Sequence, residues 1–226
     1  MARSESVANF ATDVIDLHAS TPGMVALEWF DDQGDVDRVT FRDFSIRSCK
    51  VANMLTREGI SRGDRVLIML PLCLEWWEII LGCMRAGIVA VLSSEASTDE
   101  SVREQIQHSD AESVVVGTEH ADLIETLASE MPQIKNRILI GWERDGWIDY
   151  DRRVSMSSVD FETCRTLPHE AGLFILPDSP DGQPAMYTHG DSKFDIQLLD
   201  AWRQGLMLTL REENAKHLGS GTERLL

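Results

Sequence analysis

The side chains best suited to chemistry stand close together in the last quarter of the chain. His189 follows Asp178 and Asp181 and comes shortly before Asp191. A histidine beside carboxylates can act as a general base near neutral pH. His169, earlier in the same quarter, can converge on the same cleft. We therefore predict an acid–base site made of His189, His169, Asp178 and Asp181. The alternative is that each histidine is a structural or solvated loop residue.

Metal and cofactor chemistry have little support in the same region. Asp178, Asp181 and Asp191 carry the hard oxygen ligands that a divalent cation prefers, but their spacing matches no defined site. The sequence contains no nucleophile elbow, no zinc-binding HExxH run and no dinucleotide fingerprint. The four cysteines form no CxxC pair and no cluster with histidine. We expect no metal and no cofactor.

Composition excludes some classes of partner. The 226 residues carry a net charge of −17, which repels the phosphates of nucleic acids and anionic membrane surfaces. No apolar run approaches the roughly 20 residues of a membrane span, and the polar N-terminus has no signal-peptide core. We expect a cytoplasmic protein that contacts neither nucleic acid nor membrane.

Strand-like and helical segments alternate along most of the chain. Apolar runs bounded by glycine or proline predict strands, and segments with apolar residues at helical spacing predict helices. The predicted strands are 25–30, 36–39, 65–70, 88–92, 113–117, 137–141 and 173–176, and the predicted helices are 40–59, 75–85, 99–109, 121–130 and 194–215. This alternation is typical of an α/β fold with a parallel or mixed sheet flanked by helices. We expect one domain over residues 1–226.

The predicted last helix and a tryptophan pair suggest an apolar contact between distant segments. On a helix over 194–215, the residues Leu198, Leu199, Trp202, Leu206 and Leu210 share one face. Trp76 and Trp77 point about 100° apart on their helix, so one should enter the core while the other lines a groove or interface. Trp202 is expected to face the same groove.

Several ordered segments resemble adenylate-forming enzymes, and most closely the medium-chain acyl-CoA synthetases. The resemblance covers residues 9–190, and residues 191–226 are expected to form the last helix and a tail. The matching segments are Asn9–Val14, Val51–Leu55, Gly59–Val66, Leu70-Pro71, Glu75-Trp76-Trp77, Leu81–Gly87 and Asp145–Asp149. The resemblance implies that this chain has the fold of the N-terminal subdomain of those enzymes. Gly82 and Gly87 are structural positions in it, where a helix packs closely and then ends.

The phosphate loop of that family is degenerate here. The family pattern is Thr-Ser-Gly-Thr-Ser/Thr-Gly-x-Pro-Lys, whereas residues 177–186 read Pro-Asp-Ser-Pro-Asp-Gly-Gln-Pro-Ala-Met, in which only Gly182 and Pro184 fit. Prolines lack the N–H donors that cradle phosphate. The aspartates place negative charge where polyphosphate would sit, and two unit charges about 4 Å apart interact by roughly 4 kcal/mol near a surface, here repulsively. Ala185 replaces the lysine.

The resemblance places the family's adenine, ribose and lid elements beyond Leu226. We therefore expect no adenylation or thioesterification from this polypeptide alone, and a homodimer that covers apolar surface. Three functions stay open. The first is ATP-independent acid–base chemistry on a hydrophobic small molecule, for example cyclisation, dehydration, isomerisation or hydrolysis in a biosynthetic pathway. The second is a non-catalytic pseudoenzyme that binds an acyl or aryl ligand or a full-length synthetase. The third is residual ligase activity in trans.

Overall fold

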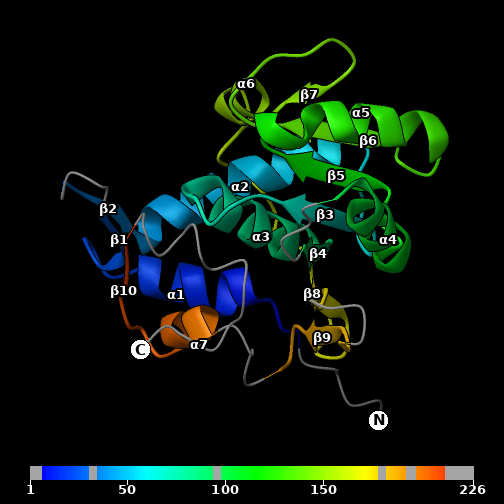
Figure 1. Ribbon diagram of the computed structural model, residues 1–226. Helices are drawn as coiled ribbons and strands as arrows, with labels where there is room; N and C mark the ends of the chain where they lie inside the picture. The colour runs from blue at the N-terminus through cyan, green and yellow to red at the C-terminus, as the bar shows by residue number, and fades with distance from the viewer. Residues whose placement is uncertain (1–6, 31–34, 94–97, 178–181, 192–196, 212–226) are drawn as a thin grey trace.

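The fold consists of two sheets, one large and one small (Figure 1). The computed structural model describes residues 7–30, 35–93, 98–177, 182–191 and 197–211. The seven-stranded sheet has the order β7-β6-β5-β3-β4-β8-β9, and the three-stranded sheet has the order β10-β1-β2. The strands are β1 (Val25–Phe30), β2 (Val36–Thr40), β3 (Arg65–Met69), β4 (Val89–Leu92), β5 (Ser113–Val116), β6 (Asn136–Leu139), β7 (Ile148–Asp149), β8 (Ala171–Ile175), β9 (Ala185–Thr188) and β10 (Leu208–Arg211).

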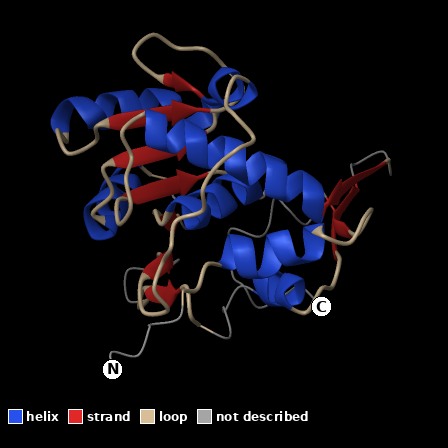
Figure 2. Ribbon diagram, turned by 180° about the vertical axis from the view of Figure 1, so that it is seen from behind, coloured by secondary structure: helices blue, strands red, loops and turns tan. Residues whose placement is uncertain are grey.

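Helices enclose the larger sheet, whose strands are parallel except for β9, which runs antiparallel to β8 (Figure 2). The helices are η1 (Ala11–Asp16, a π-helix), α1 (Leu17–Ala19), α2 (Phe41–Arg57), α3 (Leu74–Ala86), α4 (Asp99–Ser109), η2 (Thr118–His120, a 3-10 helix), α5 (Ala121–Glu130), α6 (Tyr150–Ser155) and α7 (Gln197–Arg203). This confirms the predicted α/β fold with a mixed sheet. None of the helices among the described residues has the length and apolar character needed to cross a membrane.

Successive side chains of the central strands enter two separate cores. Val66 and Ile68 of β3 pack in one cluster with α2 and α3, whereas Leu67 and Met69 pack in a second cluster with α4 and α5. A strand buried on both faces needs apolar residues at every position, because its side chains alternate between the faces. This requirement explains why the sequence of β3 shows a continuous apolar run.

Two glycines of α3 have the structural roles expected from the sequence. A Cβ at Gly82 would lie 2.5 Å from Cγ1 of Val51, so α3 and α2 approach closely there. Gly87 follows the helix with a φ of 72°, the left-handed conformation of a helix C-cap. Thr40 is the N-cap of α2, and its hydroxyl accepts a hydrogen bond from the Asp43 amide in a capping box.

The prediction of a helix over residues 194–215 is wrong. Within its described part, α7 ends at Arg203, and Gly205 adopts a φ of 72° that turns the chain away. Leu208 and Leu210 are both buried on β10, which pairs in parallel with β1. Their two-residue spacing fits a strand with one buried face. Leu206 is exposed and not helical, so it shares no helix face with Trp202.

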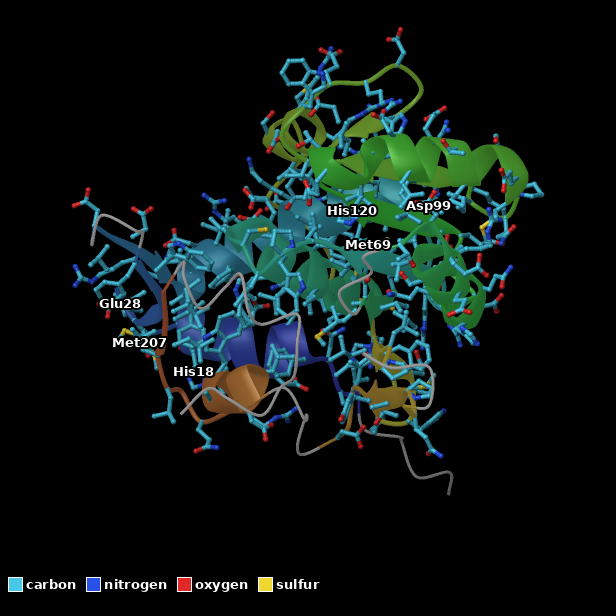
Figure 3. All side chains as sticks on the ribbon, viewed as in Figure 1. His18, Glu28, Met69, Asp99, His120 and Met207 are labelled. Atoms are coloured by element: carbon cyan, nitrogen blue, oxygen red, sulfur yellow. The ribbon has the colours of Figure 1, made fainter. Side chains whose placement is uncertain are left out.

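The aromatic contact between distant segments exists, but inside the core. Trp77 is fully buried, whereas Trp76 is partly exposed, as the helical spacing predicts. The ring of Trp202 lies 4.7 Å from that of Trp77 between centroids, so α7 is fastened to α3. His18 of α1, which is labelled in Figure 3, packs on Phe41 with 5.0 Å between the ring centroids. The chain thus covers much of this apolar surface itself.

Candidate functional site: the β8–β9 hairpin

The register of the β8–β9 hairpin determines where His189 lies. Ala171 pairs with Thr188 at one end of the hairpin, and Ile175 pairs with Ala185 at the other. The amide of His189 donates to the carbonyl of Glu170 at 2.9 Å. The histidine therefore lies at the start of β8, which is the amino edge of the parallel strands (Figure 1).

The structure brings His189 next to the turn that carries His169. Gly190 donates its amide hydrogen bond to Pro168 at 2.8 Å, so the two histidine-bearing segments are joined by backbone contacts. The His169 side chain itself is exposed. The predicted proximity of the two segments is therefore present, whereas only His189 is enclosed.

The described residues that flank the predicted aspartates lie at the other end of the hairpin. Asp178 and Asp181 lie outside the described residues. The strand residues nearest to them on either side, Ile175 and Ala185, pair at the end opposite His189. Four residue steps along a strand span about 13 Å. Asp191, the third aspartate, accepts a hydrogen bond from the Thr188 amide at 2.6 Å and so closes the turn.

The His189 side chain is buried, and its ring nitrogens are unpaired within the described part of the chain. The residue is 4% exposed, and neither ring nitrogen has a hydrogen-bond partner among the described residues. Its ring lies against Gly172, where a Cβ would be 3.2 Å from Nε2. Burial lowers the pKa of His189 to about 4, with Arg62 also lowering it, while Glu170 and Asp13 oppose this change. The imidazole is therefore neutral near pH 7, with an acceptor nitrogen available.

Glu170 is the carboxylate that the sequence analysis missed. Arg62 donates to it through Nε at 2.9 Å and through Nη2, and the Leu167 amide donates at 3.2 Å. The hydrogen bond from Arg62 lowers the pKa of Glu170. The one feature of the sequence that could have indicated Glu170 was its position directly after His169. Its partner Arg62 precedes it by over a hundred positions, so no local pattern relates the two residues.

Replacing His189 by glutamine should remove part of the acid sensitivity of the fold. The unfolded histidine, with a pKa of about 6.5, binds more protons than the folded one between that pH and about 4, so stability falls as the pH falls through this window. The full effect is roughly 3 kcal/mol at 1.36 kcal/mol per pKa unit. Urea unfolding at a series of pH values should show a smaller loss for His189→Gln. The exposed control His169→Gln should behave like the wild type; equal slopes for all three proteins would contradict the burial of a neutral imidazole.

The described part of the chain contains no cluster of side chains that could bind a metal ion. No group of three or more His, Cys, Asp or Glu side chains there is placed to hold an ion. The four cysteines are free, and Cys49 and Cys83 are buried. Burial raises the pKa of the Cys83 thiol, which suits a small apolar side chain and not a reactive one.

The described residues within 177–186 and next to them belong to the strands of the hairpin or adjoin them. Leu176 still pairs with the sheet, since its amide donates to the Leu92 carbonyl at 3.0 Å, and Pro177 follows without an N–H group. Ala185, at the position of the family lysine, is the first residue of β9. No cationic side chain stands at that position to meet a phosphate.

Comparisons with known proteins agree on one family. A sequence profile described as AMP-binding enzyme matches residues 16–181. The chain is 32% identical to the mitochondrial acyl-coenzyme A synthetase ACSM4 of Rattus norvegicus, over 89% of this chain and 36% of that protein. It is 31% identical to the mitochondrial acyl-coenzyme A synthetase ACSM2B of Homo sapiens, over 88% of this chain and 36% of that protein. The chain thus spans little more than a third of the length of these relatives.

Solved structures share the fold at lower identity. The anthranilate CoA ligase AuaEII, in complex with anthranoyl-AMP, matches with a TM-score of 0.79 and 17% identity, over 90% of this chain and 45% of that one. An acyl-CoA synthetase of Brucella canis matches with a TM-score of 0.79 and 19% identity, over 94% of this chain and 44% of that one. At these identities the likeness concerns the fold.

Proposed function

Because the chain belongs to the AMP-binding enzyme family, we propose that it is an acyl-CoA synthetase-like protein that binds an acyl or aryl molecule without activating it with ATP. The observation that carries the proposal is the chemistry of residues 177–186. Two prolines without N–H donors, two aspartates and Ala185 replace the hydroxyl, glycine and lysine pattern of a phosphate cradle. A triphosphate would meet negative charge there and gain few hydrogen bonds.

The placement of the hairpin supports a ligand at the opposite edge from His189. In parallel α/β sheets, ligands bind beyond the carboxyl ends of the strands. β3, β4 and β8 end on that edge, where Pro177 follows β8 and Ala185 begins β9. His189 lies at the amino edge, about one strand length away. This separation favours binding without catalysis over an acid–base site that combines His189 with Asp178 and Asp181.

The ATP prediction is tested by thermal unfolding with millimolar MgATP. We expect no change in Tm, because a ligand present at its Kd or below stabilises by well under 1 kcal/mol, while one at 100 times Kd stabilises by about 2.7 kcal/mol. A panel of hexanoate, octanoate, benzoate and anthranilate should include a ligand that raises Tm. A raised Tm with MgATP would contradict the loss of nucleotide binding, and no response to any acid would contradict the acyl or aryl ligand.

Acid–base catalysis by His189 is the second candidate, favoured by one observation. The ring is buried, its nitrogens have no hydrogen-bond partner among the described residues, and Glu170 is the nearby carboxylate. A ligand that reached this position would meet a neutral imidazole able to accept a proton. Conversion of a hydrophobic substrate that disappears in His189→Gln and survives in His169→Gln would support it.

Two partner proposals accompany these functions. A homodimer remains a proposal, although Trp202, Leu208 and Leu210 are already buried within one chain. Pairing with a full-length synthetase, and residual ligase activity in trans with one, are the alternatives to self-association. Sedimentation of the protein alone, followed by sedimentation with a synthetase, separates self-association from mixed association.

A further inference from the structure

A cavity of about 500 Å³ opens where β5 and β6 end, away from the β8–β9 hairpin. Its lining residues are Thr118, Ala121, Asp122, Leu139, Trp142 and Arg144. They come from the carboxyl end of β6, the segment after β5 and the loop that precedes β7. His120, labelled in Figure 3, directly precedes α5 and marks the end of that helix that borders the cavity. Small-molecule sites have volumes of roughly 300–1,000 Å³.

The residues that line the cavity differ in exposure, because some are buried and one is a largely exposed tryptophan. Leu139 and Ala121 are buried and provide an apolar floor. Trp142 lines the cavity and is nevertheless 70% exposed, more than any other tryptophan among the described residues. An indole left in water is a large apolar surface that a flat ring can cover by stacking. A planar, apolar ring is therefore the kind of group that Trp142 is suited to hold.

A positioned cation lines the same cavity. The guanidinium of Arg144 lies 5.6 Å from the ring centroid of Trp147, and that ring is held in turn by a hydrogen bond from Nε1 to Glu125 at 2.6 Å. Arg137 lies over the same ring, also at 5.6 Å. Arg144 is thus oriented by packing, and a planar guanidinium so held can bind an anionic group with two parallel hydrogen bonds.

The present partner of Arg144 is easily exchanged. Arg144 donates to Asp122 at 2.8 Å, but the Asp122 side chain is 97% exposed. Exposed ion pairs contribute about 0–1 kcal/mol, so an anion that also stacks on Trp142 can take the place of the carboxylate. Asp122 is itself one of the lining residues, so the incoming anion must displace its carboxylate from Arg144 into solvent.

We propose that this cavity is a second ligand site, separate from any site at the β8–β9 hairpin, and that it takes a small planar aromatic anion. The ring stacks on Trp142 above the floor of Leu139 and Ala121, and the anionic group pairs with Arg144. The anion is a carboxylate or a phosphate, since both present the oxygen pair that a guanidinium binds. The site is independent of the proposed function, because it shares no residue with residues 177–186 or with His189.

The indole N–H resonances in a ¹⁵N-correlated NMR spectrum test the site directly. The sequence contains six tryptophans, and Trp142→Phe assigns the relevant signal. Titration with 2-naphthoate should shift the Trp142 signal saturably. Cyclohexanecarboxylate, which has the charge without the flat ring, and 2-naphthalenemethanol, which has the ring without the charge, should each bind at least about tenfold more weakly, since 1.4 kcal/mol is a factor of ten. Phenyl phosphate against benzoate then decides between phosphate and carboxylate.

Variants separate the two contacts from a general effect. Isothermal titration calorimetry, which does not depend on the Trp142 signal, should show that Trp142→Ala and Arg144→Met each weaken 2-naphthoate about tenfold, which is at the lower end of the roughly 1–3 kcal/mol measured for aromatic stacking and near the roughly 1.5–3 kcal/mol of a hydrogen bond to a charged group. Met156→Ala removes another exposed apolar side chain that does not line the cavity, and it should bind as the wild type does. Equal binding by all variants, or shifts confined to other indoles, would overturn the site. So would a Trp142 signal that moves with protein concentration alone, because a second copy would then cover the indole.

Discussion

Replacing Asp16 with alanine should destabilise the protein by about 3 kcal/mol, at the lower end of the range for breaking a buried ion pair. Asp16 binds Arg85 through both carboxylate oxygens, at 2.7 and 2.9 Å. The Arg85 side chain is 3% exposed and that of Asp16 is 32% exposed, so the charge left behind by the replacement is the buried one. Ser48 and Thr163 are the other side-chain hydrogen-bond partners of this guanidinium. Without Asp16 the chain would hold a buried cation with neutral partners only, which costs far more than the pair itself contributes.

The matched control is an ion pair of equal length on the surface. Arg38 contacts Glu28 at 2.7 Å, the same distance as the closer contact of Arg85 with Asp16, but the Arg38 side chain is 61% exposed. Glu28→Ala removes the acid of this pair, as Asp16→Ala does, and leaves a cation that water can solvate, so it should cost no more than about 1 kcal/mol. Urea unfolding of both variants measures the difference.

A double replacement strengthens the same test. Asp16→Ala combined with Arg85→Met removes both charges and leaves an apolar side chain in the interior, so part of the lost stability should return. If Asp16→Ala and Glu28→Ala cost the same, or if the double variant is less stable than Asp16→Ala, burial of the remaining cation is not the source of the effect. The four segments that meet at Arg85 are η1, α2, α3 and the chain before β8.

Trp202→Ala should cost about 3–5 kcal/mol, the range for truncating a buried aromatic side chain to alanine. Trp202 is fully buried, and its ring lies 4.7 Å from Trp77 and 4.9 Å from Phe44 between centroids. Its Nε1 donates to the carbonyl of Ala26 at 2.9 Å, which joins α7 to β1. Losing this side chain removes both the packing and the hydrogen bond that hold α7 and β10 on the rest of the molecule.

Two further variants show which contribution dominates. Trp202→Phe keeps a ring but loses the donor to Ala26, and an unsatisfied buried carbonyl costs about 1–3 kcal/mol. Trp142→Ala removes a tryptophan that is 70% exposed and should change the free energy of unfolding by no more than about 0.5 kcal/mol. Denaturant unfolding gives all three values. A Trp202→Ala variant as stable as Trp142→Ala would contradict the role of this residue as the anchor of α7.

Local patterns in the sequence were sufficient for most of the fold. The apolar run of β3, with its alternate side chains in two cores, is a property of consecutive residues and could be predicted without a structure. The same holds for the Thr40 capping box and for the end of α3 at Gly87. The family followed from many ordered segments, and the departures in residues 177–186 are visible because each one concerns the chemistry of a single residue type.

The errors in the fold came from signals that are short or compete with one another. The leucines after residue 197 fit a helical period, but Gly205 ends α7 and the two-residue spacing of Leu208 and Leu210 places them on a strand. No strand or helix was predicted within residues 143–168, and this stretch contains β7 and α6, two elements too short to show a period. β9, with four residues, was missed for the same reason.

The candidate site depended on contacts that no local pattern reports. The residue types around His189 suggested acid–base chemistry, yet the antiparallel register of β8 and β9 places this histidine at the end of the hairpin away from Ile175 and Ala185. Its electrostatic neighbours, Arg62 and Asp13, are more than a hundred positions away along the chain and are brought to it by tertiary packing. Residue chemistry and periodicity act over a few positions and are readable in order along the chain, whereas burial, pKa and the distance between two side chains arise only when distant segments pack together.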